Sequence, residues 1–260
     1  MRLRLSLKFI GFFGFLSIPH ILNKLGANPE IFINWDKIAK EFWTNTEHHL
    51  LSLWSTFSIG AVSVFISLLL GVCLGLLFAY YNRWLGFFET VMKFIWSIPL
   101  IVVAVYLNIF IDNTNYYIII TGVFLGIFPI LSFVYHKAAE KDEGIVSLVA
   151  SFNLSKRSEF RHFRLREIWQ NLAIPLAQSI PLTYIGVTMG EYTVGRVAGT
   201  TDYGLGSDFQ FGMQYTKFEK VYVAIILMVF LVFLSGEIFE FLSRLRGFIN
   251  NIKVKIIGEE

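Results

Sequence analysis

The side chains that could carry catalysis or bind a metal ion are few and scattered. The chain has a single cysteine, Cys73, and it lacks the phosphate-binding pattern G-x-x-x-x-G-K-[ST]. The histidines follow no metal-ligand spacing; they are His20, His48, His49, His136 and His162. The sequence therefore predicts no catalytic residue, no metal site and no nucleotide site on this chain.

Glu191 is the ionisable residue with the most informative position. It ends an uncharged run, Leu172 to Gly190, that is about long enough to cross a bilayer, and ionisable residues at such places usually serve a function. Glycines that permit tight turns follow it: Gly195, Gly199, Gly204 and Gly206. We expect a helix to end near Glu191 and Thr193–Gly206 to fold back over it, with Glu191 accepting backbone N–H groups. The alternative is a solvated carboxylate at the outer surface.

The elements that would position these residues are membrane helices. Hydrophobic residues make up 55% of the chain and charged residues only 16%, whereas soluble domains carry about 25% charged residues. Further uncharged runs cover 50–82, 94–111 and 115–135, and a helix needs roughly 20 apolar residues to cross the hydrocarbon core. The predicted fold class is therefore an all-α integral membrane protein.

Two weaker stretches complete six predicted transmembrane helices, namely Val221–Gly236 and Leu7–Leu22. The second could instead be a cleaved signal peptide, but no small-x-small cleavage site follows Phe15, so we favour a retained span. The resulting organisation is an N-terminal span at 1–25, an outer amphipathic segment at 26–49, a core at 50–245 with a cytoplasmic loop at 137–170, and a cytoplasmic tail at 246–260.

The distribution of Lys and Arg gives the orientation. Most of these residues fall in the first eight positions, the 137–167 loop and the tail, and the positive-inside rule then places both termini in the cytoplasm. Within the outer segment, Trp35, Ile38, Phe42 and Trp43 recur at helical spacing. That helix could lie in the membrane interface or pack over the bundle.

The cytoplasmic loop has the pattern of two short amphipathic helices. Its first half carries an apolar stripe of helical period that includes Leu148, Val149 and Phe152, and Asn153 is suited to end that helix. Ser155 is a good N-cap for the second helix, in which Phe160 and Phe163 share a face. The loop is interpreted as a docking element for a cytoplasmic partner. A basic loop that only sets the topology is the alternative.

This loop, DEGIVSLVASFNLSKRSEFRHFRLREIWQNL, resembles the signature loop of bacterial ABC importer permeases. Other pieces resemble the nitrate/sulfonate/taurine subfamily: Asn28-Pro29, Trp96-Ser97-Ile98-Pro99-Leu100, Gly190-Glu191 and Gly204-Leu205-Gly206. The resemblance departs from the family pattern where Ser147 replaces a Glu, Leu148 and Val149 replace two alanines, Asn153 replaces a Gly, and Arg166 replaces a Pro.

The resemblance implies a fold of a five-helix core plus an N-terminal span, in the bacterial inner membrane. It also implies partners: ABC ATPase subunits that bind ATP-Mg, a second permease copy in a homodimer or heterodimer, and an external solute-binding protein. The ATPase-coupling residues would be Ser147, Leu148, Val149, Phe152, Asn153, Phe160 and Phe163. The gate or pathway candidates are Pro99, Tyr184, Thr188, Glu191, Gly204 and Gly206.

The function implied is that of the membrane subunit of an ATP-driven importer, which is not itself an enzyme, and nothing in the sequence suggests nucleic-acid binding. A secondary transporter, or another polytopic membrane protein without an ATPase partner, is the alternative. Such a transporter usually buries coupling carboxylates or repeats itself internally. The uncharged runs contain no Asp or Glu, and no internal repeat is evident.

Overall fold

The computed structural model of the chain describes most of the predicted core. Described residues are 11, 14, 17–18, 20–26, 28, 31–80, 90, 94, 97–139, 151, 155–194 and 204–257, with the backbone alone at 80, 156–157, 162–163 and 238–257. Every regular element among them is helical, which agrees with the all-α prediction.

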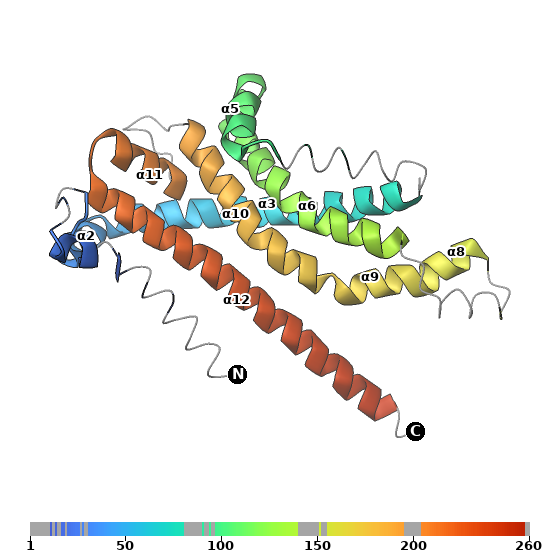
Figure 1. Cartoon of the computed structure of the whole chain (residues 1–260). Helices are drawn as coiled ribbons and strands as arrows, with labels where there is room; N and C mark the ends of the chain where they lie inside the picture. Colours follow the sequence, from blue (N-terminus) through green and yellow to red (C-terminus); the bar gives the residue numbers. More distant parts are fainter. Residues whose placement is uncertain are drawn as a thin grey trace.

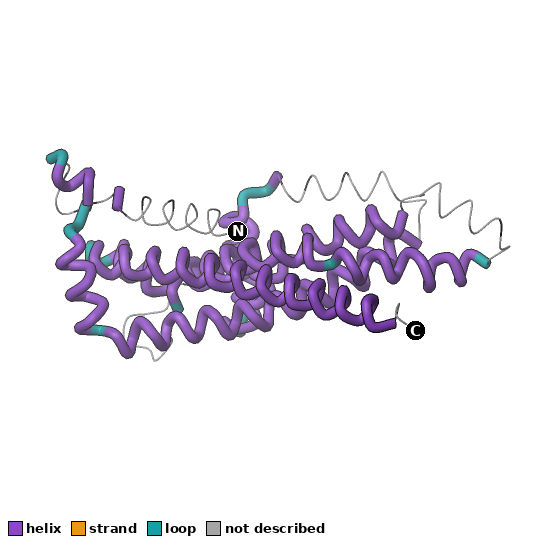
Figure 2. The backbone as a smooth tube through the Cα atoms, turned by 90° about the horizontal axis from the view of Figure 1, so that it is seen from below, coloured by secondary structure: helices purple, strands orange, loops and turns teal. Residues whose placement is uncertain are grey.

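Three long helices form the centre of the molecule (Figure 1): α3 (Thr46–Tyr80), α6 (Thr114–Ala139) and α10 (Ala173–Val194). Helix α6 lies between the other two and packs most extensively against both. Figure 2 shows that the helices run roughly along one long axis, so the molecule has two distinct ends.

Helix α3 buries its small and polar residues and exposes its large apolar ones. The buried positions recur every three or four residues: His49, Ser52, Thr56, Gly60, Ser63, Ser67, Gly71 and Gly75. On the outer faces, Trp54 and Phe65 are exposed. This pattern is the reverse of that in a water-soluble helix, and it suits a bilayer, where lipid solvates apolar side chains and small residues allow close helix packing.

The close packing is tight enough to exclude even a methyl group. A Cβ atom at Gly186 of α10 would lie 2.6 Å from the backbone oxygen of Thr121 in α6. A Cβ atom at Gly60 of α3 would lie 2.1 Å from the ring of Tyr184. The glycines therefore allow α3, α6 and α10 to pack in direct contact, because there is no room for a larger residue between the helices.

A bend joins α10 to the preceding short helix α9 (Leu165–Asn171), and the two axes differ by 54°. Pro175 lies in the first turn of α10. Because proline has no N–H group, it cannot donate to the carbonyl of Asn171, which frees the chain to bend there. Among the described residues, Pro129 in α6 and Pro181 in α10 also lie inside their helices.

One end of the molecule is closed by α2 (Trp35–Thr44), α11 (Leu205–Gln214) and the start of α12 (Phe218–Ile257). Ile38 of α2 is buried, whereas Trp43 is 75% exposed. The amphipathic helix predicted in the outer segment is present and packs over the bundle through Ile38. Helix α12 then runs the length of the molecule in Figure 1.

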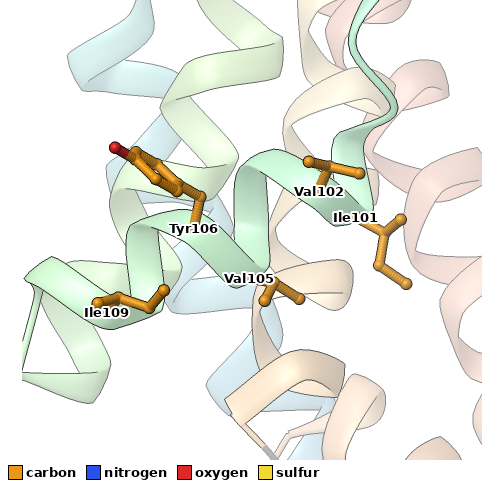
Figure 3. A pocket seen from close by; sticks show the side chains of 5 residues that line it. All are labelled: Ile101, Val102, Val105, Tyr106 and Ile109. Carbon is orange, nitrogen blue, oxygen red and sulfur yellow. The ribbon is translucent and has the colours of Figure 1, made fainter.

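The short helix α5 (Leu100–Phe110) projects from the side of the bundle (Figure 1). It is held by Ala104, whose backbone oxygen accepts a hydrogen bond of 2.9 Å from the Tyr117 hydroxyl. A shallow hollow of about 320 Å³ lies along this helix and is lined by Ile101, Val102, Val105, Tyr106 and Ile109, whose side chains are drawn in Figure 3. In a bilayer, lipid tails cover such an apolar surface, so it needs no protein partner.

The number of spans in the described residues is smaller than the number predicted from the sequence. Three helices are long and apolar enough to cross a membrane, α3, α6 and the first half of α12, and α9 with α10 makes a fourth if the bent pair is one span. Helix α5 is apolar but shorter. Much of the predicted N-terminal span and most of the residues between 81 and 96 lie outside the described residues.

Helix α10 contains Glu191 and runs to Val194, which is consistent with the predicted helix end near Glu191. One expectation is wrong: the glycine-rich stretch 196–214 has the composition of an irregular loop, but residues 205–214 form the helix α11. The physical reason is that contacts with α3 and α10 stabilise α11. Local sequence patterns do not reveal such contacts.

Candidate functional site

Glu191 lies at the junction of three helices and is fully buried. Its two carboxylate oxygens accept hydrogen bonds from the hydroxyl of Thr56 in α3, at 2.9 and 3.0 Å. The backbone N–H of Gly206 in α11 donates to the same carboxylate at 2.9 Å. The side chain of Glu191 therefore ties α3 and α11 to α10, and it is not solvated at the surface as the alternative interpretation required.

Thr56 connects the same helices a second time. Its hydroxyl oxygen accepts a hydrogen bond of 2.9 Å from the backbone N–H of Leu205. The first N–H groups of a helix have no partner within the helix, and its N-terminus carries partial positive charge. Gly204, the N-cap of α11, offers no side chain to satisfy them. Glu191 and Thr56 do so from neighbouring helices, which explains why α11 begins at this point.

Gly204 and Gly206 allow the approach of α11 to Glu191. A Cβ atom at Gly204 would lie 2.8 Å from the carboxyl carbon of Glu191. A Cβ atom at Gly206 would lie 2.1 Å from the backbone oxygen of Thr188 and 2.8 Å from Cβ of Glu191. Both glycines are thus needed for space. We refer to Thr56, Glu191, Gly204, Leu205 and Gly206 as the Glu191 cluster.

The other gate residues predicted from the sequence are Tyr184 and Thr188, which lie in α10 as Glu191 does, and Pro99, which precedes α5. Tyr184 is buried against α3, and its hydroxyl donates to the backbone oxygen of Phe57 at 3.4 Å. The hydroxyl of Thr188 donates within α10 to the carbonyls of Tyr184 and Ile185. Pro99 is exposed, precedes α5, and belongs to a different element from the cluster.

A second polar group holds α11 on its other side. Asp208 of α11 is buried, and its Oδ1 lies 2.7 Å from Nε2 of His48 in α3 and 3.1 Å from Nζ of Lys220 in α12. Burial raises the pKa of the Asp208 carboxyl, but the hydrogen bond from His48 and the charge of Lys220 outweigh it and hold the pKa below the ordinary value of 3.8. Asp208 is therefore ionised at neutral pH and anchors α11 to α3 and α12.

Beside this group lies a cavity of about 440 Å³, lined by Glu41, Asn45, His48, Phe211, Lys217, Glu219 and Lys220. The ammonium groups of Lys217 and Lys220 lie over the Phe211 ring, at 5.4 and 4.8 Å from its centroid. The buried ring of His49 stacks on Phe42. Within the described residues, no group of three or more His, Cys, Asp or Glu is arranged to hold a metal ion.

The sequence analysis did not single out Thr56, His48, Asp208 and Lys220. For Thr56 a signal exists: it belongs to the small and polar stripe of α3, which recurs every three to four residues within an otherwise apolar run. For Asp208 and Lys220 there is no local signal, because their partner His48 is far away in the sequence and is brought to them only by the fold.

At the opposite end of the molecule, the loop that was predicted to be cytoplasmic, 137–170, is described in part. Ser147, Leu148, Val149, Phe152 and Asn153 lie outside the described residues. The predicted N-cap is present, since the Ser155 hydroxyl accepts the Ser158 N–H at 3.3 Å, and α8 (Lys156–Glu159) begins there. Phe160 packs against a core cluster that contains Val134 and Ile168. For Phe163 the backbone alone is described, in a helical turn.

Comparison with known families finds a match. A family model described as binding-protein-dependent transport system inner membrane component matches residues 71–246. A comparison with curated proteins found no similar sequence. The matched range begins within α3 and includes α5, α6, α10, α11 and the membrane-spanning part of α12. It also includes Glu191, Gly204 and Gly206. Because the match covers well over half of the chain, this protein belongs to the family of inner membrane components of binding-protein-dependent transport systems, a family of membrane transport subunits and not of enzymes.

Proposed function

We propose that this chain is the permease subunit of an ATP-driven ABC importer and forms the translocation path for a small solute. The observation that carries the proposal is the family match over residues 71–246, which includes the cytoplasmic signature loop. The absence of a P-loop motif supports it, because the energy for transport must then come from another chain. The solute class suggested by the sequence resemblance is nitrate-, sulfonate- or taurine-like, or a vitamin precursor.

The proposed assembly contains two permease copies, ATPase subunits that bind ATP-Mg on the cytoplasmic face, and an external solute-binding protein that delivers the solute. In this proposal the chain crosses the membrane six times with both termini in the cytoplasm. The end of the molecule that carries α2 and α11 then faces outward, and the loop at 137–170 faces the ATPase.

The topology can be tested with single cysteines in a Cys73→Ser background. A cysteine at Ser158 is expected to react with a membrane-impermeant maleimide only from the cytoplasmic side, and a cysteine at Gly199 only from the outside. Intact cells and inverted vesicles provide the two sides. The reverse pattern would rule out the proposed orientation and, with it, ATPase docking at the 137–170 loop.

The docking role of the loop can be tested by placing charge in its apolar stripe. Leu148→Asp combined with Val149→Asp is expected to release the ATPase while the permease still inserts, because burying two unpaired carboxylates in a contact surface costs several kcal/mol. The measurement is the amount of ATPase that co-purifies with tagged permease. Arg161→Gln is the matched control, since Arg161 is exposed in the same loop and is expected to retain the ATPase. Wild-type amounts of ATPase on the double variant would exclude this stripe as the docking surface.

A further inference from the structure

The second half of the cytoplasmic loop is attached to α6 by Arg164. Its guanidinium donates to the backbone oxygen of Ala138 at 2.6 Å, at the C-terminal end of α6. The same guanidinium donates through Nε and Nη2 to Oε1 of Glu159, at 3.1 and 2.7 Å. The last carbonyls of a helix have no partner within the helix and carry partial negative charge. Arg164 therefore binds the last described turn of α6 from the loop.

A local change in helix geometry makes this contact possible. Between α8 and α9 the chain forms a π-helical turn, η2 (Phe160–Arg164), in which the Leu165 N–H donates to the Phe160 carbonyl five residues earlier. In an ordinary α-helix, side chains three or four residues apart meet, and side chains five apart do not. The wider turn brings Glu159 and Arg164 together. Such turns in other proteins often occur at functional sites.

Two further contacts join the same pieces. Nζ of Lys137 in α6 lies 3.1 Å from Oε1 of Glu167 in α9. Phe160 packs into the core cluster that α6 and α9 share. In Figure 1, α8 and α9 lie beside the C-terminal end of α6. The segment from Glu159 to Glu167 is thus fixed to α6 by a guanidinium, an ion pair and an aromatic ring.

We propose that Arg164, Glu159, Lys137 and Glu167 form a joint that passes movement of the cytoplasmic loop on to α6. The inference rests on the proposed function and divides the loop into two parts. The first part, with Leu148 and Val149, binds the ATPase. The second part, from Glu159 to Glu167, does not bind the ATPase but moves α6 when the ATPase closes. Arg164 is the main positioning residue, because it contacts both the loop and α6.

The division predicts different results for variants in the two parts. We would purify the wild-type permease with its ATPase in lipid nanodiscs, in a Cys73→Ser background, with a reporter cysteine at Gln214. Gln214 is exposed at the end of α11, at the opposite end of the molecule from the joint. The rate of maleimide labelling is measured without nucleotide and with ATP and vanadate, which traps the closed ATPase.

The wild-type complex is expected to change its labelling rate when ATP and vanadate are added. Arg164→Gln is expected to keep the ATPase bound and hydrolysing ATP but to lose the ATP-dependent change in labelling. A merely destabilised protein would lose ATPase binding, hydrolysis and the labelling change together. Arg161→Gln removes the same charge from an exposed position in the same segment and is expected to behave like the wild type.

Lys137→Glu and Glu167→Lys offer a second test if Arg164→Gln does not fold. Each single variant is expected to weaken the ATP-dependent change, and the double variant, which restores the ion pair in reverse, is expected to regain it. The joint is overturned if Arg164→Gln labels like the wild type, if Arg164→Gln releases the ATPase, or if the double variant recovers nothing. Absence of any ATPase from the wild-type preparation would instead overturn the proposed function, and this inference with it.

Discussion

Gly206→Ala is expected to displace α11 from α10. The new Cβ atom would lie 2.1 Å from the backbone oxygen of Thr188, and a helix backbone cannot yield as the end of a flexible side chain can. Overpacking of this kind typically costs about 1–3 kcal/mol. The backbone N–H groups of Leu205 and Gly206 would lose their acceptors, Thr56 and Glu191, as α11 moves away.

Hydrogen–deuterium exchange on the purified protein measures this displacement. Exchange in peptides that cover α11 is expected to accelerate by roughly 5- to 150-fold, the range that a local loss of about 1–3 kcal/mol implies. Gly236→Ala is the matched control, because a Cβ atom there meets nothing within 4 Å and helix propensity favours alanine. Equal exchange of α11 in the two variants would show that Gly206 is not required for the contact.

The position of Glu191 could be predicted from the sequence because charge is informative in an apolar chain. A carboxylate at the end of a long uncharged run is rare enough to mark a site, and glycine-rich sequence after it indicates a close approach of backbone. The partner Thr56 could not be identified in the same way. A hydroxyl inside an apolar helix gives no sign of which neighbouring helix it faces, and Thr56 and Glu191 are 135 residues apart.

The sequence contains information about which face of α3 is buried. The spacing of Gly71 and Gly75 indicates close packing, and the same period continues back through Ser67, Ser63 and Gly60. In a soluble helix the larger apolar residues would mark the core side. In this helix they mark the lipid side, so the buried face becomes predictable once small and polar residues are followed instead.

Only part of the structure of the 137–170 loop could be predicted from local sequence. The N-cap at Ser155 follows from residue type alone and is present. The π-helical turn and the contact of Arg164 with the Ala138 carbonyl do not follow from residue type, because the acceptor is 26 residues away in the sequence and is brought to Arg164 only by the fold. The basic residues of this segment therefore differ in environment: Arg164 is hydrogen-bonded within the fold, whereas Arg161 and Arg166 are exposed.

Glu191→Gln is expected to loosen α11 without preventing assembly of the transporter. The Glu191 carboxyl accepts hydrogen bonds from the Thr56 hydroxyl and the Gly206 N–H, and an ionised carboxylate makes such bonds charge-assisted. A glutamine side chain has a similar shape but no charge and only one acceptor oxygen, so the hydrogen bonds from Thr56 and Gly206 fall on one weaker acceptor. Losing a buried hydrogen bond to a charged group costs about 1.5–3 kcal/mol, which shifts the equilibrium between docked and undocked α11 by roughly 10- to 150-fold.

If docking of α11 closes the outer end of the translocation path, undocking of α11 should change the rate at which the transporter hydrolyses ATP. The reconstituted Glu191→Gln complex is expected to hydrolyse ATP faster than the wild type in the absence of solute, with the same amount of ATPase bound. Glu47→Gln is the matched control, because Glu47 is an exposed carboxyl in the first turn of α3, the helix that carries Thr56. Its ATPase rate should equal that of the wild type. A Glu191→Gln complex that shows faster exchange of α11 but an unchanged ATPase rate would separate the two roles, leaving Glu191 as an anchor for α11 and excluding it as part of the gate.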